Sequence, residues 1–200
     1  MIFELKESKM AGSVEIRNSL TGQLLIAMPG MQDPRFEKTV IFVCAHNADG
    51  AMGLIVNKPI DSITFPDLLE QLNLADNGTS NLIDVQLGGP VEGTRGFVLH
   101  SLDYIRDATL VVDEETALTA TLDILREIAV GDGPRRCFLA LGYAGWGAGQ
   151  LDREIINNGW LNVESDEELV FGENLGNKWA RALEKMGIDP RMLSDSFGHA

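Results

Sequence analysis

Short apolar runs, each closed by turn-forming residues, are the feature that most limits how this sequence of 200 residues can fold. The longest strongly apolar run, Val40 to Ala45, has the length of one β-strand and is far shorter than the roughly 20 residues that cross a bilayer. Runs of this kind alternate irregularly with amphipathic helical segments, without the regular strand-helix repeat of a parallel sheet. The pattern predicts an α+β fold, and no membrane-spanning segment is expected.

β-Branched and aromatic residues between turn residues predict the strands. Residues 39–45 and 51–57 flank the turn HNADG and predict a β-hairpin, which ends before Pro59 because proline cannot donate a ladder hydrogen bond. Further strands are expected over residues 23–28, 85–93, 95–101, 109–112 and 137–141.

Apolar residues spaced three and four apart predict the helices. Thr64 is expected to cap a helix over residues 64–74, and a second helix over 119–129 is expected to stop at Gly131. Further helical segments are expected over residues 34–38, through 155–156, over 175–186 and after the capping pair Asp189 and Pro190.

The first twenty residues set the expected domain organisation. Residues 1–19 show no helical or strand period and predict an N-terminal extension, so a single domain is expected over residues 20–200. The N-terminus also lacks the basic start and apolar stretch of a secretory signal. Cys44 and Cys137 both fall in apolar strand-like segments, where reduced and buried thiols are the usual state. Together these features predict a cytosolic protein.

The charge of the chain argues against one class of function. Lysine and arginine total 16 against 30 for aspartate and glutamate, and the formal net charge of -14 is spread over both halves. Affinity for a nucleic-acid duplex comes mainly from basic side chains that neutralise phosphates. Arg135 and Arg136 form the only basic doublet of the sequence, so direct nucleic-acid binding is not expected.

The glycine-rich stretch from Leu141 to Gln150 follows a predicted strand and leads into a predicted helix. Free N–H groups at such a helix start can hold an anion, but these glycines match neither the dinucleotide-binding spacing nor the phosphate-loop spacing. In the alternative interpretation they allow close backbone packing, while Tyr143 and Trp146 pack or line a cleft.

Gly88 and Gly89 form a second predicted bend, which is followed by Arg95 and His100. An arginine held by a shaped loop in an acidic protein can select a carboxylate or a phosphate. In the alternative, Arg95 ties down its own loop by bonding backbone carbonyls or Glu92.

His46 and Asn57 stand on either side of the predicted hairpin turn and form the third candidate site. General acid-base chemistry needs a histidine within reach of its partner, and a metal site needs several converging ligands. The three histidines show no metal-binding spacing and the two cysteines are isolated, so no metal ion and no other cofactor is expected. The acidic run from Glu164 to Glu168 is interpreted as a solvated loop, because its spacing is unlike that of a calcium loop.

Three segments of the sequence together resemble the AlgH/YqgE family of uncharacterised bacterial proteins. The resemblance runs from about Leu20 to the end of the chain and is carried by LIAMPGMQDPRFEKTVIFVCAHNADGAMGLIVNKP, LGGPVEGTRGFVLHS and LGYAGWGAGQLDREIINNGWL. It implies an α+β fold in which bifurcated, mostly antiparallel β-structure curls into a pseudo-barrel flanked by helices, and a location in the bacterial cytosol. It implies no known activity or catalytic residues. Members carry the label of transcriptional regulators through a genetic link to alginate production.

The leading hypothesis is a non-enzymatic protein that binds a small anion or a protein partner and regulates indirectly. It requires the bend from Gly88 to Arg95 and the turn from Gly142 to Gly149 to converge on one site. The rival hypothesis is an enzyme that uses His46 or His100 as its acid or base. In a third interpretation the glycines serve packing alone. The oligomeric state is left open by the sequence.

Overall fold

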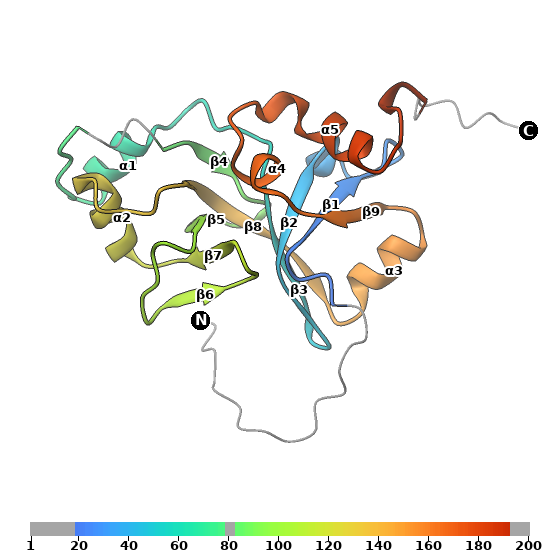
Figure 1. Cartoon of the computed structure of the whole chain (residues 1–200), viewed down its shortest axis with the longest axis horizontal. Helices are drawn as coiled ribbons and strands as arrows, with labels where there is room; N and C mark the ends of the chain where they lie inside the picture. Colours follow the sequence, from blue (N-terminus) through green and yellow to red (C-terminus); the bar gives the residue numbers. More distant parts are fainter. Residues whose placement is uncertain (1–18, 79–82, 193–200) are drawn as a thin grey trace, which may run out of the picture.

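The computed structural model describes residues 19–78 and 83–192, and Figure 1 shows how their helices and strands are arranged. The expected extension over residues 1–19 and the last residues of the chain lie almost wholly outside this range. The described strands are β1 (Gln23–Ala27), β2 (Val40–Asn47), β3 (Gly50–Ile55), β4 (Val85–Leu87), β5 (Val91–Ser101), β6 (Thr109–Val111), β7 (Thr116–Thr119), β8 (Cys137–Gly147) and β9 (Trp160–Glu164). The described helices are α1 (Phe65–Gln71), α2 (Leu122–Val130), α3 (Gln150–Ile156), α4 (Glu167–Phe171) and α5 (Lys178–Lys185), with 3-10 turns η1 (Pro34–Phe36), η3 (Leu175–Asn177) and η4 (Pro190–Met192).

The strands form one curled sheet in the order β6-β7-β5-β8-β3-β2-β1-β9, and β4 pairs with β8 beside that path. The pairings between these strands are antiparallel except that of β4 with β8. The long strand β8 pairs with β5 through its first half and with β3 through its second half, so it joins the two halves of the sheet. The expected α+β class is confirmed, as is the mostly antiparallel, curled half-barrel flanked by helices that the family resemblance implies.

Helices cover both faces of the sheet (Figure 1), and the buried apolar residues form three cores. On one face, α4 and α5 contribute Leu169 and Leu183 to a core that includes Leu99 of β5. On the other face, α1 and α2 pack against the half of the sheet that contains β5 and β7. The remaining core lies between α3, η1 and the half that contains β1 and β2, and its buried residues include Trp160. Among the described residues, no helix is long and apolar enough to cross a membrane.

Capping residues determine where the short helices begin and end. Thr64 forms a capping box with Asp67 at the start of α1, as the sequence predicts. Asp166 caps α4 by accepting a hydrogen bond from the Leu169 N–H at 2.8 Å. Gly131 ends α2 with a left-handed φ of 89°, a conformation that glycine adopts without steric penalty. The predicted cap at Asp189 is also present, at the start of η4.

Two predicted boundaries are wrong because strand pairing overrides local signals. β8 continues through the glycine-rich stretch to Gly147, where a turn is predicted, since its second half finds a partner in β3. The sequence predicts a helix that begins at Thr119, but Thr119 belongs to β7 and pairs with Val98, so α2 begins only at Leu122. A local propensity is weak compared with the hydrogen bonds of an available strand edge.

Two other differences concern the bend and the edge of the sheet. The strand expected over residues 85–93 is divided by the bend after Leu87, and its last residues belong to β5, which runs from Val91 to Ser101. β9 is a strand that the sequence does not predict. It lies at one end of the sheet and pairs with β1, which is far away in the chain, so no neighbouring segment indicates it.

Candidate functional site

The eight residues singled out from the sequence lie in separate parts of the fold. His46 and Trp146 share one row across the sheet, because His46 pairs with Ala51 of β3 and Ala51 pairs with Trp146 of β8. Asn57 lies beyond the far end of β3. The four groups are His46 with Trp146, Asn57 alone, Gly88 and Gly89 with Arg95 and Tyr143, and His100 alone.

His46 holds the start of the described chain against the sheet. Its Nδ1 accepts the Leu20 N–H at 3.2 Å, so in the neutral ring the proton lies on Nε2, which is 3.6 Å from a carboxylate oxygen of Asp152. The His46 N–H donates to the Thr21 hydroxyl at 2.9 Å. Both ring nitrogens of this buried histidine therefore face protein groups, in the manner of a structural residue.

His100 is fully buried in the β5–β7 half of the sheet. Its Nδ1 lies 2.9 Å from the Ser101 carbonyl oxygen and its Nε2 lies 2.9 Å from the Thr119 hydroxyl. Burial lowers the pKa of His100, and the hydrogen bond to Ser101 opposes this effect only in part. A neutral ring held at both nitrogens anchors β5 to β7.

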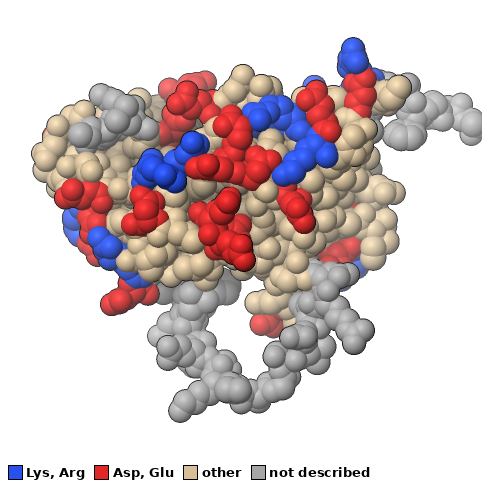
Figure 2. All heavy atoms as spheres, viewed as in Figure 1, with Lys and Arg blue, Asp and Glu red and all other residues tan. Residues whose placement is uncertain are grey.

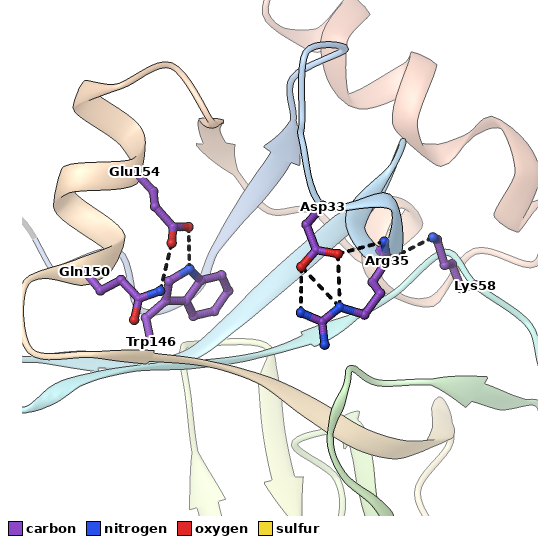
Figure 3. A network of polar contacts seen from close by, with 6 residues as sticks. All are labelled: Asp33, Arg35, Lys58, Trp146, Gln150 and Glu154. Atoms are coloured by element: carbon purple, nitrogen blue, oxygen red, sulfur yellow. Dashed lines mark hydrogen bonds and ion pairs between the residues drawn. The ribbon is translucent and has the colours of Figure 1, made fainter.

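Trp146 belongs to a group of hydrogen bonds with side chains of α3, and Figure 3 shows its contact with Glu154 and that of Glu154 with Gln150. One carboxylate oxygen of Glu154 accepts the indole N–H of Trp146 at 2.9 Å and that of Trp160 at 2.8 Å. The other accepts the Gln150 amide at 2.8 Å. The two indoles meet edge to face with ring centroids 5.9 Å apart, and Phe36 of η1 packs on Trp160 in the same way. We call Trp146, Gln150, Glu154 and Trp160 the indole cluster.

Asn57 fixes the turn that leads into β2. Its side-chain oxygen accepts the Val40 N–H at 2.8 Å, and its amide donates to the Lys38 carbonyl at 2.9 Å. Lys38 has a φ of 50°, a left-handed conformation that these bonds stabilise. Figure 3 shows the neighbouring Lys58, which donates to the Arg35 carbonyl at 3.0 Å, while Arg35 pairs with Asp33.

The two glycine-rich segments meet, and they meet through their backbones. A Cβ atom at Gly88 would overlap the carbonyl of Gly142, and one at Gly89 would overlap the backbone of Tyr143. Side chains at these positions are therefore excluded by close strand packing, which the sequence left open as the alternative to an anion site.

Arg95 lies on the surface of β5 beside this packing. Its guanidinium pairs with Glu92 at 3.1 Å and lies over the Phe97 ring, 5.0 Å from the centroid. Phe97 in turn packs edge-on against Tyr143. These contacts correspond to the alternative in which Arg95 ties down its own segment.

A cleft of about 260 Å³ lies elsewhere, where the end of β5, the start of β7 and the segment before β8 meet α4. We call it the α4 cleft. It is lined by Ser101, Leu102, Asp103, Glu115, Thr116, Arg135, Ser165, Asp166, Glu167, Val170 and Phe171. Sequence reasoning missed it, although the Arg135-Arg136 doublet and the acidic run at Glu164 to Glu168 both reach it. Only the pairing of distant strands brings these two signals together.

Hydrogen bonds fix the floor of the α4 cleft. Ser101 and Thr116 are cross-strand partners, so their side chains point to the same face of the sheet. The Ser101 hydroxyl donates to Asp103 and accepts the Arg136 N–H at 3.1 Å, and Asp103 accepts the Arg135 N–H at 2.9 Å. Partial burial would raise the pKa of Asp103, but these hydrogen bonds outweigh it and hold the pKa below its ordinary value.

Ion pairs fix the α4 side of the cleft. Glu167 pairs with the Arg136 guanidinium at 2.7 Å, and Asp166 pairs with Lys185 of α5 at 2.8 Å. Burial opposes ionisation of Asp166, but the bonds from Lys185 and the Leu169 N–H lower its pKa. Figure 2 shows carboxylates gathered in the middle of this face with basic side chains on either side.

Metal ligation and thiol chemistry find little support in the described part of the chain. Within residues 19–78 and 83–192, no three histidine, cysteine, aspartate or glutamate side chains converge as a metal site. Both cysteines are free, and burial raises the pKa of Cys44 and of Cys137 to about 12. A thiol with such a pKa is protonated at neutral pH and is a poor nucleophile.

The fold and the cleft define an α+β protein built on a curled half-barrel, with a small polar cleft at the ends of three strands. The family model described as AlgH-like matches residues 24–191, and the chain belongs to this family. It is 56% identical over 181 residues to a UPF0301 protein of Rhodospirillum rubrum, covering 90% of this chain and 94% of that one. A UPF0301 protein of Afipia carboxidovorans is 58% identical over 189 residues and 90% of each chain.

Solved structures agree with this assignment. The solution structure of the AlgH protein of Pseudomonas aeruginosa matches with a TM-score of 0.76 and 37% identity, covering 96% of this chain and all of that one. A crystal structure of a Corynebacterium diphtheriae protein matches with a TM-score of 0.66 and 18% identity over 86% of this chain and 88% of that one, which shows a shared fold alone. The family resemblance expected from the sequence is thus confirmed.

Proposed function

We propose that this chain is a small-ligand-binding protein whose binding site is the α4 cleft. The observation that carries the proposal is the combination, in one cleft of about 260 Å³, of a hydrogen-bonded polar floor with an apolar wall formed by Val170 and Phe171. Concave sites with a few converging polar groups and apolar walls are the usual form of ligand sites. In this proposal the cleft replaces the glycine-rich turns as the place of binding.

Any influence on gene expression would act through the ligand or a protein partner, without direct contact to DNA. The net charge of -14 supports this part of the proposal, because it repels a polyanion at every approach. The proposed place of action is the cytosol, where Cys44 and Cys137, which form no disulfide, would stay reduced.

Thermal unfolding with panels of nucleotides, carboxylic acids, amines and amino acids tests the proposal. A ligand at one hundred times its Kd stabilises the folded state by about 2.7 kcal/mol, which raises the Tm of a chain of this size by roughly 5–10 °C. We expect at least one class to produce such a shift, and duplex DNA at physiological salt to produce none. A Tm that every class leaves unchanged would remove the proposal.

A further inference from the structure

We infer that the ligand of the α4 cleft is a small zwitterion, and that an α-amino acid with a compact apolar side chain is the chemical class that fits it. The inference rests on the proposed function and adds the chemistry of the ligand. It is carried by three features of the cleft: one side chain of each charge that forms no ion pair, a threonine hydroxyl that has no protein partner, and an apolar wall.

Arg135 and Glu115 supply the two charges from different walls. Arg135 precedes β8, and Glu115 lies in the turn between β6 and β7. Within the described residues, neither side chain has an ion pair or a hydrogen bond; only their backbone N–H groups are engaged. Among the other described arginines, all except Arg153 pair with a carboxylate. The exposed Arg135 guanidinium feels the charge of Asp103 without forming an ion pair with it, so its N–H groups can still donate to a carboxylate from outside.

The remaining carboxylates of the cleft are already engaged. Asp103 accepts the Ser101 hydroxyl and the Arg135 N–H, Asp166 accepts Lys185 and the N–H of Leu169, and Glu167 pairs with Arg136. Glu115 is thus the carboxylate of the cleft that remains for an incoming ammonium group. The cleft therefore presents one positive and one negative side chain to a ligand, because its other carboxylates are bound to protein groups.

Thr116 adds a hydrogen-bonding group to the cleft. It is only 3% exposed, lines the cleft, and points to the same face as its cross-strand partner Ser101. In the described part of the chain its hydroxyl forms no hydrogen bond, although its backbone N–H donates to Asp113 at 2.7 Å. The hydroxyl oxygen is accessible at the cleft surface, where an incoming group can reach it. A ligand carboxylate or ammonium group in the cleft would supply a hydrogen-bond partner for it.

The apolar wall and the volume limit the rest of the ligand. Val170 is buried and Phe171 is half-buried, with its ring packed edge-on against Phe138 from the core side. A volume of about 260 Å³ lies below the roughly 300–1,000 Å³ of sites for drug-sized ligands. An amino-acid-sized molecule with a compact apolar side chain meets both limits, whereas a nucleotide or a folded peptide segment exceeds them.

Electrostatics separates the zwitterion from singly charged molecules of the same size. A simple anion would meet Arg135 but also Glu115 and the field of a chain with a net charge of -14. A simple cation would meet Glu115 but also the Arg135 guanidinium. A molecule with both charges places its carboxylate beside Arg135 and its ammonium group beside Glu115. The cleft is then specific for it, because it attracts both groups of the zwitterion and repels molecules with a single charge.

The test is a backbone-amide NMR titration of the full chain with L-leucine and its two singly charged analogues, 3-methylbutylamine and 4-methylpentanoate. We expect leucine to shift the signals of Thr116, Ser165 and Phe171, with each analogue binding at least tenfold more weakly. Arg135→Gln should weaken leucine at least tenfold and strengthen the amine, because the repulsion by the guanidinium is removed. Glu115→Gln should weaken leucine similarly and strengthen the acid.

Matched control variants are Arg126→Gln on α2 and Glu114→Gln, which neighbours the cleft without lining it. Both should bind leucine like the unchanged protein. An analogue that binds at the cleft as tightly as leucine would overturn the zwitterion while sustaining a ligand site. Leucine shifts confined to residues outside the cleft would also overturn it. If no molecule of the thermal panel acts on the cleft, the proposed function itself fails.

Discussion

The indole cluster and the α4 cleft both combine carboxylates with aromatic side chains, but only the cleft contains polar side chains that have no partner in the protein. In the indole cluster, Glu154 accepts three N–H donors and both indoles are buried. In the α4 cleft, Arg135, Glu115 and the hydroxyl of Thr116 have no side-chain partner among the described residues. Residue types alone do not separate the two regions. Polar side chains that all have protein partners indicate a structural role. Polar side chains without protein partners in a cleft indicate a binding site.

Removal of the Glu154 carboxylate should have the largest effect on stability. Glu154→Ala leaves two buried indole N–H groups without an acceptor, and we expect a loss of about 3 kcal/mol in the free energy of unfolding. Urea denaturation measures it. Glu154→Gln keeps one acceptor oxygen and should lose clearly less. A loss below about 1 kcal/mol for the alanine variant would show that the indole cluster is not a structural lock.

Removal of the Ser101 hydroxyl should have a smaller effect, because it lies at the floor of the cleft but has partners. Ser101→Ala deprives Asp103 of a donor and the Arg136 N–H of an acceptor, and we expect a loss of about 1.5 kcal/mol. Urea denaturation again measures the free energy of unfolding. A Ser101→Thr variant, which keeps the hydroxyl, is the control, and equal losses in the two variants would point to packing instead of hydrogen bonding.

Lys178 tests how firmly α4 is held, through the pH dependence of stability. It is 1% exposed, and its Nζ donates to the carbonyls of Val56 at 3.0 Å and Val170 at 2.8 Å. Burial lowers its pKa to about 8, against the opposing influence of Glu168 and Asp84. Between pH 8 and the ordinary pKa of 10.5, Lys178 binds more protons in the unfolded chain than in the folded chain. The contribution of Lys178 to stability therefore rises with pH in this range.

We expect Lys178 to add about 1 kcal/mol between pH 8 and pH 9, measured by urea denaturation at each pH. The two buried thiols contribute in the opposite direction in the same range, because in the unfolded chain they ionise around their ordinary pKa of 9 and in the folded chain they stay protonated. The contribution of Lys178 is therefore measured as the difference between the protein and a variant without this lysine. Lys178→Met should remove this part of the slope. An unchanged slope in the variant would show that another group titrates.

Removal of the Thr116 hydroxyl should have the smallest effect on stability. This variant tests the difference between polar groups that have protein partners and those that do not. Thr116→Val keeps the shape of the side chain and removes a hydroxyl that has no partner, so we expect a change within about 0.5 kcal/mol. A loss as large as that of Ser101→Ala would mean that the hydroxyl is bonded in solution. Ligand binding, measured by the NMR titration, should weaken in this variant despite its unchanged stability.

Much of the fold could be predicted because local chemistry is strong where elements begin and end. The hairpin of β2 and β3, the Thr64 cap and the Gly131 stop all follow from neighbouring residues. β9 and the second half of β8 could not be predicted, because their partners are far away in the chain. The same reason hid the cleft, since Glu115, Arg135 and Asp166 come from three separate segments.

The sequence by itself determined the class of fold, the family and the acidic surface, because strand-length apolar runs, motif segments and net charge do not depend on how distant residues meet. Only the tertiary structure decided what individual polar residues do. It enclosed His46, His100 and Trp146 with partners and packed the glycines backbone to backbone. It also left Arg135, Glu115 and Thr116 facing one cleft. The physical reason is that a polar side chain is defined by its partner and its burial, and both are set by strand pairing across the sheet.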